Sequence, residues 1–487
     1  MFSNSKNWYI GGGEFHSVTN YYNTKTSETA QKGKHIFVSY LTKSQAYLYT
    51  GIKLLQNKVV PGALYNSDER YDPPRCHPHT REVILQEIID WIEDIDRQTR
   101  FLWLYGPAGA GKSAIEQTIA EWCYRMNFLA ASFFFSRSVG GRNEKAFLIT
   151  TIVDQLIVSI PEIREHVGNA LYNNPSLPSR SLEAQMDALV IKPLEAAASS
   201  STGRINIMDR RPRVIVLDGL DECGDPESQR YILQVLLKSV SNHSIPFSFI
   251  IASRPEQHIR EAFDGKLLNS LTTRLVLDDK YHPDDDIRTF LQSKFRDIRD
   301  RHPSRTLPSS WPSDEDRERL VQKSSGQFIY ASTVVKFIDS HRHWPPDRLD
   351  IVFGISPRGK TTPFAEMDSL YLHILMSASD NIETALEIFA ILLFLPHQYL
   401  QITPQLLESF LSLRAGEVFM VLSDLHSIIS VPSPDEHGSP LRLFHASLGD
   451  FLTDRSRSDT FFLDSGVCHR NIVNRIVKQL MNPTSGR

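Results

Sequence analysis

The fold is decided by one short stretch, Gly106-Pro107-Ala108-Gly109-Ala110-Gly111-Lys112-Ser113, which matches the phosphate-loop pattern G-x-x-x-x-G-K-[ST]. It follows the apolar run Phe101–Tyr105, typical of a strand buried on both faces, and precedes a helical pattern over Ser113–Arg125. Such a loop curves its backbone N–H groups around a phosphate, and the helix N-terminus adds partial positive charge. We therefore expect residues 106–114, Ala114 included, to bind a nucleotide, with Lys112 on the phosphate oxygens and Ser113 on Mg²⁺.

A second apolar segment, Val214–Leu217, runs into an acidic series that begins with Asp218 and ends with Asp221 and Glu222. A central strand here would deliver Asp218 to the sheet edge beside the phosphate loop, where its carboxylate would hold Mg²⁺. Glu222 is the candidate to position or deprotonate an attacking water, with Asp221 close to the metal. The alternative interpretation is an exposed acidic turn.

A third apolar segment, Phe249–Ala252, ends in the polar pair Ser253 and Arg254, followed by Pro255. Because the carboxyl ends of parallel strands meet at one sheet edge, Arg254 would lie near the loop and could sense the terminal phosphate. Without the other two motifs, a surface salt bridge would be the preferred interpretation of this arginine.

Strands and helices are expected to alternate through this part of the chain. Further strand candidates are Ala131–Phe135, Arg213–Leu217, Phe247–Ala252 and Arg274–Leu277. Thr80 can N-cap a helix whose apolar residues repeat at helical spacing through Asp96. The alternation predicts an α/β fold, a P-loop NTPase with a parallel sheet in the ASCE-type strand order. Helices followed by a small hairpin at residues 428–444 then predict a winged-helix module.

Composition shifts and proline-rich stretches divide the chain into segments. We expect a low-complexity arm (1–34), a short helix and linker (35–75), a nucleotide-binding domain (76–277), a helical domain (278–345), a linker (346–365), a winged-helix domain (366–465) and a C-terminal tail (466–487). The arm mixes aromatic residues with four each of Asn, Ser, Thr and Gly. Such a composition suits a plain flexible tail or, on contact with copies of itself, cross-β stacking.

Charge and cysteine content narrow the classes of partner. The net charge of −4, from 53 Lys+Arg and 57 Asp+Glu, gives no global positive field for nucleic acid or anionic membranes. The four cysteines lie too far apart for a disulfide framework, and we interpret the cluster Cys76–His79 as incidental. The most apolar run, Phe389–Leu395, falls short of the ~20 residues that span a bilayer. With no secretory signal at the N-terminus, we expect a cytoplasmic protein without a membrane span.

Several further stretches carry a resemblance to a known family. They are Pro74–Glu82, the phosphate loop, Leu217–Cys223, Ser253–Pro255, Ser325–Tyr330 and Leu443–Leu452. On these, residues 50–465 resemble the NACHT class of STAND NTPases, in the NLR-like form abundant in mushroom-type (basidiomycete) fungi. The resemblance implies nucleotide-binding, helical and winged-helix domains that close over ADP, then open and oligomerise when ATP replaces it.

The resemblance also implies roles for residues that no motif assigns. Thr80 and Arg81 correspond to residues on the adenine side of the nucleotide, against the alternative of a helix cap and a solvated arginine. His445 corresponds to the winged-helix histidine that contacts the β-phosphate of ADP, and Asp450 is expected to matter less. The chain departs from the family at Gln327, where many relatives have a proline on the adenine. The sequence also stops at Arg487, where family members usually continue into a repeat domain, so we expect either a short form or a fragment.

These observations predict an ATP-binding molecular switch in intracellular signal transduction, in fungal nonself recognition or programmed cell death. We expect at most slow, Mg²⁺-dependent ATPase activity, with ATP or ADP as ligand and self-association on activation. The upstream ligand and downstream effector stay unassigned. The alternatives are a scaffold that binds ADP and hydrolyses nothing and, less favoured, an AAA+-like ATPase that works on nucleic acid. The segment Gly416–His426 contains no Lys or Arg and would make a poor recognition helix.

Overall fold

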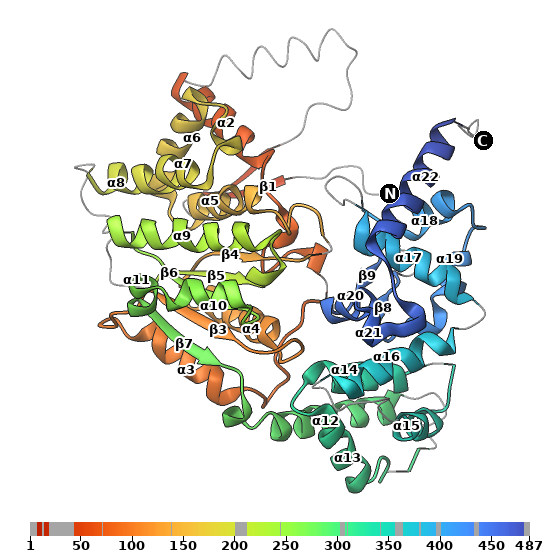
Figure 1. The fold of residues 1–487 in the computed structure, drawn as a ribbon. Coiled ribbons are helices and arrows are strands. Elements are labelled where there is room, and N and C mark those ends of the chain that lie inside the picture. The colour runs from red at the N-terminus through yellow and green to blue at the C-terminus, as the bar shows by residue number, and fades with distance from the viewer. Residues whose placement is uncertain are drawn as a thin grey trace.

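The computed structural model describes residues 7–11, 14–18, 43–70, 72–137, 139–199, 212–243, 245–301, 307–308, 310–340, 342–355, 364–378, 381–395, 401–432 and 438–481. Figure 1 shows the sheet-containing region on one side of the molecule and a helical region on the other, with α12 (Pro283–Arg301) running between them.

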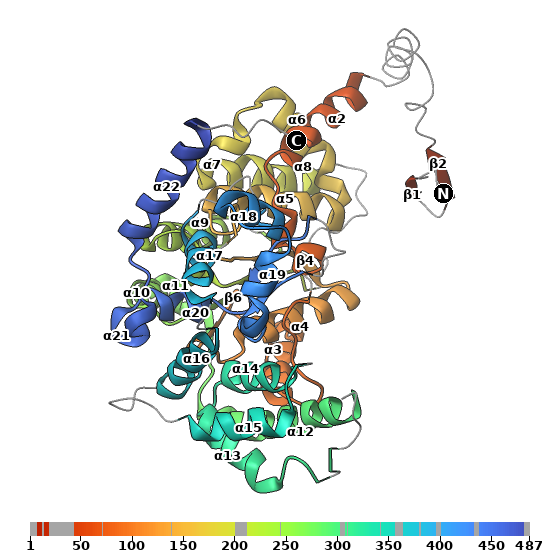
Figure 2. The ribbon, with the colours of Figure 1, turned by 90° about the vertical axis from the view of Figure 1, so that its right-hand side faces the viewer.

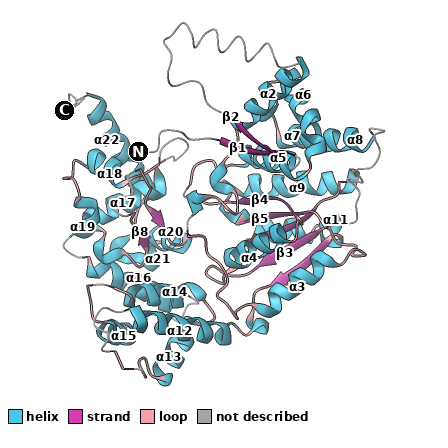
Figure 3. Cartoon of the chain, turned by 180° about the vertical axis from the view of Figure 1, so that it is seen from behind, coloured by secondary structure: helices cyan, strands magenta, loops and turns pink. Residues whose placement is uncertain are grey.

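The centre of the first region is a five-stranded sheet. Its strands are β3 (Phe101–Tyr105), β4 (Leu129–Phe134), β5 (Val214–Asp218), β6 (Ser248–Ser253) and β7 (Thr272–Val276). All neighbours pair in parallel, in the order β4-β5-β6-β3-β7, and Figure 3 shows them as one twisted layer. Strand β6 separates β3, which leads into the phosphate loop, from β5, which carries Asp218. This is the ASCE-type order, so the predicted fold class is confirmed.

Helices cover both faces of the sheet because successive strand residues point to opposite sides. Phe101 and Trp103 of β3 belong to the core packed under α5 (Leu148–Ser159), α9 (Pro226–Asn242) and α10 (Gln257–Asp264). Leu102 and Leu104 belong to the core under α3 (Glu82–Glu93) and α4 (Lys112–Arg125). The resulting three layers explain why the inner strands β3, β5 and β6 are buried along almost their whole length, whereas the edge strand β7 is only partly buried.

Further helices extend this region at the end away from α3. They are α2 (Lys43–Gln56), α6 (Arg164–Asn173), α7 (Leu182–Met186), the π-helical turn η7 (Asp187–Ile191) and α8 (Lys192–Ser199). The short helix α11 (Lys266–Ser270) lies instead beside α10, directly before β7. Helices α2 and α6 cross closely at Gly51 and Gly168, since a Cβ on Gly51 would lie 2.1 Å from the Gly168 carbonyl oxygen. Figure 2 shows α2 beside α6.

The second region is helical and shares one hydrophobic core from Ile287 to Ile472. Its helices are α12, α13 (Asp314–Ser324), α14 (Phe328–Ile338), α15 (Pro345–Gly354), α16 (Ala365–Ser377), α17 (Ile382–Phe394), α18 (Pro404–Leu411), α19 (Glu417–Val421), α20 (Ala446–Leu452), α21 (Arg455–Ser458) and α22 (Ser465–Met481). The predicted hairpin forms as the antiparallel pair β8 (Ile429–Ser430) and β9 (Arg442–Leu443).

The structure differs from the sequence interpretation at several elements. Residues 346–354 of the expected linker (346–365) belong to α15, because Pro345 and Pro346 sit at the first helical positions, where no N–H is needed. The expected tail continues as α22. Thr80 does not cap α3, because the N-cap residue is Arg81 in the left-handed conformation.

The N-terminal arm contains a described antiparallel pair, β1 (Asn7–Gly11) and β2 (Glu14–Val18), and its remaining residues up to 42 lie outside the described part. Among the described residues, no single helix has both the length and the apolar character to cross a membrane. Two consecutive helices, Lys145–Ser159 and Pro161–Asn173, together have the length and composition of a membrane span, but they are sharply bent relative to each other.

Candidate nucleotide-binding site

The phosphate loop has the geometry that its sequence predicts. Gly109 and Gly111 adopt φ of +77° and +93°, a region that residues with a Cβ rarely enter, and α4 begins directly afterwards at Lys112. Gly106 packs so closely on Leu277 that an added Cβ would lie 2.9 Å from its Cβ. The Lys112 Nζ donates to the carbonyl oxygens of Gly106 and Pro107, both at 2.8 Å. Lys112 therefore lies over the loop, where it can reach a bound phosphate.

The predicted magnesium ligands meet at the end of β5. Asp218 is buried, and its carboxylate accepts a hydrogen bond from the Ser113 side chain. Burial raises the pKa of Asp218, which means that its charge is poorly compensated by water. A carboxylate beside a hydroxyl is a donor set that Mg²⁺ accepts, with nucleotide oxygens and water completing the shell. Nowhere among the described residues do three or more His, Cys, Asp or Glu side chains form a metal cluster.

Asp221 and Glu222 lie in the one-turn helix η8 (Leu220–Glu222), directly after β5. The Asp221 carboxylate pairs with Arg254, accepting from its backbone N–H at 2.9 Å and lying 3.2 Å from its Nε. The Glu222 Oε2 accepts from the backbone N–H of Arg137 at 3.1 Å. Burial and the neighbouring Asp221 raise the pKa of Glu222 to about 7, a value that suits a group taking a proton from water.

His445, although it comes from the helical region, lies near the loop. It is the N-cap of α20, where its Nδ1 accepts from the backbone N–H of Ser447 at 3.0 Å. Burial, then the charges of Arg254 and Lys112, lower the pKa of His445 to about 4. The imidazole is therefore neutral at pH 7, and because Nδ1 accepts, the proton resides on Nε2. The ring can donate from Nε2 to an acceptor such as a phosphate oxygen.

Asp450 forms two ion pairs that the sequence did not indicate. Its Oδ2 lies 2.6 Å from Nη1 of Arg254, and its Oδ1 lies 2.9 Å from Nη1 of Arg137. Burial alone would lower the pKa of Arg254, but the neighbouring carboxylates of Asp450 and Asp221 raise it. The expectation that Asp450 matters less than His445 for ADP release stays a prediction.

Thr80 and Arg81 are both buried beside the loop. The Thr80 hydroxyl donates to the carbonyl of His77 at 2.7 Å. The Arg81 Nη2 donates to the carbonyl of Ala110 at 2.9 Å, and its guanidinium lies 4.8 Å from the centre of the Phe328 ring. Arg81 is therefore not a solvated arginine. Its contact with adenine stays a prediction.

The helical region also contacts the loop through α14, and α12 contacts Arg81 beside it. Asp286 of α12 accepts from the backbone N–H of Arg81 at 3.1 Å. The backbone N–H of Ile329 in α14 donates to the carbonyl of Gly109 at 3.4 Å, and a Cβ on Gly109 would lie 2.2 Å from its side chain. Gln327, where relatives of the resembled family have a proline, is a buried residue at the N-cap of α14.

Sequence reasoning missed three residues of this neighbourhood, Arg70, Arg137 and Asp286, and it did not foresee the ion pairs of Asp450. Arg70 is buried over the Phe134 ring and donates to Gln117 at 2.8 Å, with Asp218 among the charges it feels. Arg137 follows β4 at the sheet edge where Asp218 and Arg254 lie. This position after a predicted strand could have indicated from the sequence that Arg137 belongs to the site. The other residues depend on contacts between distant segments.

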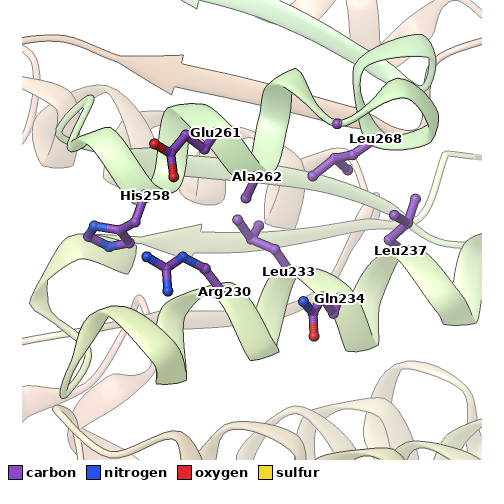
Figure 4. Close-up of a pocket in the computed structure, with 9 residues that line it drawn as sticks. Arg230, Leu233, Gln234, Leu237, His258, Glu261, Ala262 and Leu268 are labelled. Carbon is purple, nitrogen blue, oxygen red and sulfur yellow. The ribbon is translucent and has the colours of Figure 1, made fainter.

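A surface pocket of about 300 Å³ lies elsewhere, between α9 and the helices α10 and α11. Figure 4 shows Leu233, Leu237 and Leu268 along its floor and Arg230 and Glu261 at its rim. None of the predicted site residues lines it.

Comparison with known proteins points to the same region. Residues 79–254 match the family model described as Nephrocystin 3, N-terminal, which spans the phosphate loop, the Asp218 segment and Arg254. No curated protein sequence matches the chain significantly. Together with the strand order and the loop geometry, this match identifies the region as a P-loop NTPase fold.

Solved structures give only distant likenesses. A Signal Transduction ATPase with Numerous Domains (STAND) protein with a tetratricopeptide repeat sensor, from Pyrococcus horikoshii, aligns with 85% of this chain at 11% identity and a TM-score of 0.40. The chain spans 47% of that protein. Cdc6p from Pyrobaculum aerophilum aligns at 13% identity with 85% of this chain and 99% of its own, with a TM-score of 0.32. Drosophila ORC bound to DNA aligns at 12% identity with 76% of this chain and 94% of its own, also at 0.32.

Proposed function

We propose that this chain is a nucleotide-dependent switch of the STAND type, closed with ADP and open and self-associating with ATP. The observation that carries the proposal is that α20 of the helical region pairs Asp450 with Arg254 and Arg137 and brings His445 within the influence of the Lys112 and Arg254 charges. A plain nucleotide-binding enzyme needs no such contact from a distant segment. A switch does, because a ligand shifts a conformational equilibrium only if it interacts differently with the two states.

In this proposal, residues 106–114 hold the phosphates, and Ser113 and Asp218 hold Mg²⁺. Thr80 and Arg81 bind on the adenine side, and His445 donates from Nε2 to the β-phosphate in the closed form. Mg²⁺ would neutralise phosphate charge when bound. Glu222 takes the proton of the attacking water, while Asp221 orients Arg254 toward the terminal phosphate. A raised pKa on Glu222 and the contact of Arg254 with Asp221 support these roles.

The proposed closed form has a nucleotide-binding domain at residues 76–277, a helical domain at 278–345 and a winged-helix domain at 366–465. The pair β8–β9 directly before α20 supports the winged-helix assignment. Within this arrangement α20 follows the hairpin and faces Lys112 and Arg254. We assign the switch to intracellular signal transduction, in fungal nonself recognition or programmed cell death, with slow ATP hydrolysis resetting it. The cytoplasmic location belongs to the same proposal.

The proposal is tested by the nucleotide that the protein retains and by its response to exchange. The full chain is purified, its bound nucleotide is identified by chromatography, and its mass is measured by light scattering. We expect retained ADP and a monomer, and larger assemblies after exchange for Mg²⁺ and a hydrolysis-resistant ATP analogue.

Lys112→Ala is the matched control for this experiment, because it removes the main charge against the phosphates and leaves the loop backbone. It should retain little ADP and should not assemble with the analogue. A wild-type protein that binds neither ADP nor Mg²⁺-ATP would contradict the proposal.

A further inference from the structure

One carboxylate of the helical region lies between two arginines of the sheet region. Asp450 is 2.6 Å from Arg254 and 2.9 Å from Arg137, each contact joining a different carboxylate oxygen to a guanidinium Nη1. The side chains of Asp450 and Arg254 are 19% and 21% exposed, so this contact is largely shielded from water. The Arg137 side chain is 49% exposed and contacts Asp450 from the solvent side.

Both arginines are held by the turn that carries the predicted hydrolytic residues. Arg254 contacts Asp221 through its backbone N–H and its Nε, which leaves Nη1 directed to Asp450. Arg137 donates from its backbone N–H to Glu222 and from Nη2 to the carbonyl of Asp221 at 3.4 Å. The two guanidinium groups therefore meet next to Asp221 and Glu222, where a terminal phosphoryl group must lie if Glu222 activates its attacking water.

We propose that Arg137 and Arg254 form the binding site for the terminal phosphoryl group of a nucleoside triphosphate, and that Asp450 occupies this site in the closed form. Guanidinium groups bind carboxylate and phosphoryl oxygens with the same donor geometry, so the two anions compete for one pair of arginines. Asp450 is thereby a specificity-determining residue: closure is compatible with a diphosphate and opposed by a triphosphate. This inference deepens the proposed function and rests on it.

The measured quantity is the ratio of two affinities, for Mg²⁺ with a hydrolysis-resistant ATP analogue and for Mg²⁺ with ADP, obtained by calorimetry on nucleotide-free full-length protein. Asp450→Asn keeps the shape of the side chain and removes its charge. The affinity ratio should rise in favour of the triphosphate analogue by about 10-fold, the effect of one charge-assisted hydrogen bond.

A second variant separates the phosphate contact from a mere loosening of α20. Adding Arg137→Gln to Asp450→Asn removes a phosphate ligand when no carboxylate is left to compete. The affinity for the triphosphate analogue should fall by about 10-fold relative to Asp450→Asn, with ADP affinity changed by less than about twofold. An unchanged affinity for the analogue would contradict the role of Arg137.

Asp368→Asn is the matched control because it breaks a similar ion pair away from the site. Asp368 lies 2.7 Å from Arg457, and these side chains are 13% and 20% exposed. The affinity ratio should stay at the wild-type value in this variant. If it rises as in Asp450→Asn, the effect comes from general weakening of the helical region, and the inference is wrong.

The failure of this inference differs from the failure of the proposed function. A wild-type protein that binds ADP, combined with an unchanged ratio in Asp450→Asn, overturns the inference and leaves the switch intact. A wild-type protein that binds no nucleotide overturns both. If Asp450→Asn does not fold, as judged by its thermal melt, Asp450→Ser removes the same carboxylate and must give the same rise.

Discussion

Two helix N-termini face the phosphate site, and they are held in different ways. Helix α4 follows the buried strand β3 through the loop, so the backbone itself fixes Lys112 and Ser113. Helix α20 comes from the other side of the molecule and meets the site through polar contacts, chiefly those of Asp450 with two arginines. The difference teaches that, in the proposed switch, nucleotide binding and closure depend on separate contacts, because Asp450 of α20 pairs with Arg137 and Arg254 rather than with the loop.

The largest expected effect is on the rate of ATP hydrolysis and concerns Glu222, which follows β5 in the same region as α4. Glu222→Gln removes the basic carboxylate but keeps an oxygen that can accept from the backbone N–H of Arg137. We expect the single-turnover rate of ATP hydrolysis to fall by roughly 10²- to 10⁴-fold, with ADP and ATP affinities unchanged. Glu227→Gln, an exposed carboxylate in the first turn of α9, should hydrolyse normally. Wild-type turnover in Glu222→Gln would move the role to Asp221.

The next effect concerns binding on the α4 side. Lys112→Ala removes the ammonium that lies over the loop and leaves the N–H groups of α4 in place. Affinity for both ADP and ATP should fall by about 10- to 100-fold, because one charged hydrogen bond contributes roughly 1.5–3 kcal/mol. Calorimetry on both nucleotides measures the loss. Unchanged affinities would mean that the loop does not bind phosphate.

The smallest effect concerns pH and belongs to α20. His445 faces Lys112, Arg254, Asp450 and Lys336, and its pKa is lowered to about 4. Because the folded pKa lies below the usual 6.5, stability from the neutral ring is complete above pH 6.5 and is lost as the pH falls toward 4. Protonation would also place an N–H against the Ser447 N–H that caps α20.

The closed population should therefore decrease by up to roughly 10-fold between pH 7.5 and pH 5.5. The rate of ADP release, followed with a fluorescent ADP analogue, reports this change. Subtracting the same pH series for His445→Leu removes the contribution of other carboxylates and histidines. A pH dependence that is identical in the two proteins would show that His445 does not couple protonation to closure.

The sequence was sufficient where local chain geometry determines the result. Strand β3 has the predicted bounds, Lys112 begins α4 within one residue of the predicted start, and Asp218 ends β5 at the expected sheet edge. These features depend on short periodic patterns and on glycines that permit positive φ. They could therefore be found without knowledge of any distant contact.

The contacts of α20 and α12 could not be predicted in the same way. The ion pairs of Asp450 join residues that are far apart in the chain, and nothing in the local sequence fixes which arginine an aspartate meets. The same holds for Asp286 and Arg81. Helix α15 was missed for a different reason, because a proline pair both ends helices and begins them, and only the packing of Leu349 and Val352 decides between these outcomes.

The central claim, that α20 closes the nucleotide site, is tested most directly by the dissociation rate of ADP from His445→Leu. The control is His373→Leu, which changes a histidine of the same region that packs edge-on against Phe337, 6.0 Å between ring centres. We expect ADP to leave His445→Leu about 10- to 100-fold faster than wild type, from the loss of one bond to a charged acceptor. His373→Leu should release ADP at the wild-type rate. Equal rates in wild type and His445→Leu would contradict closure by α20.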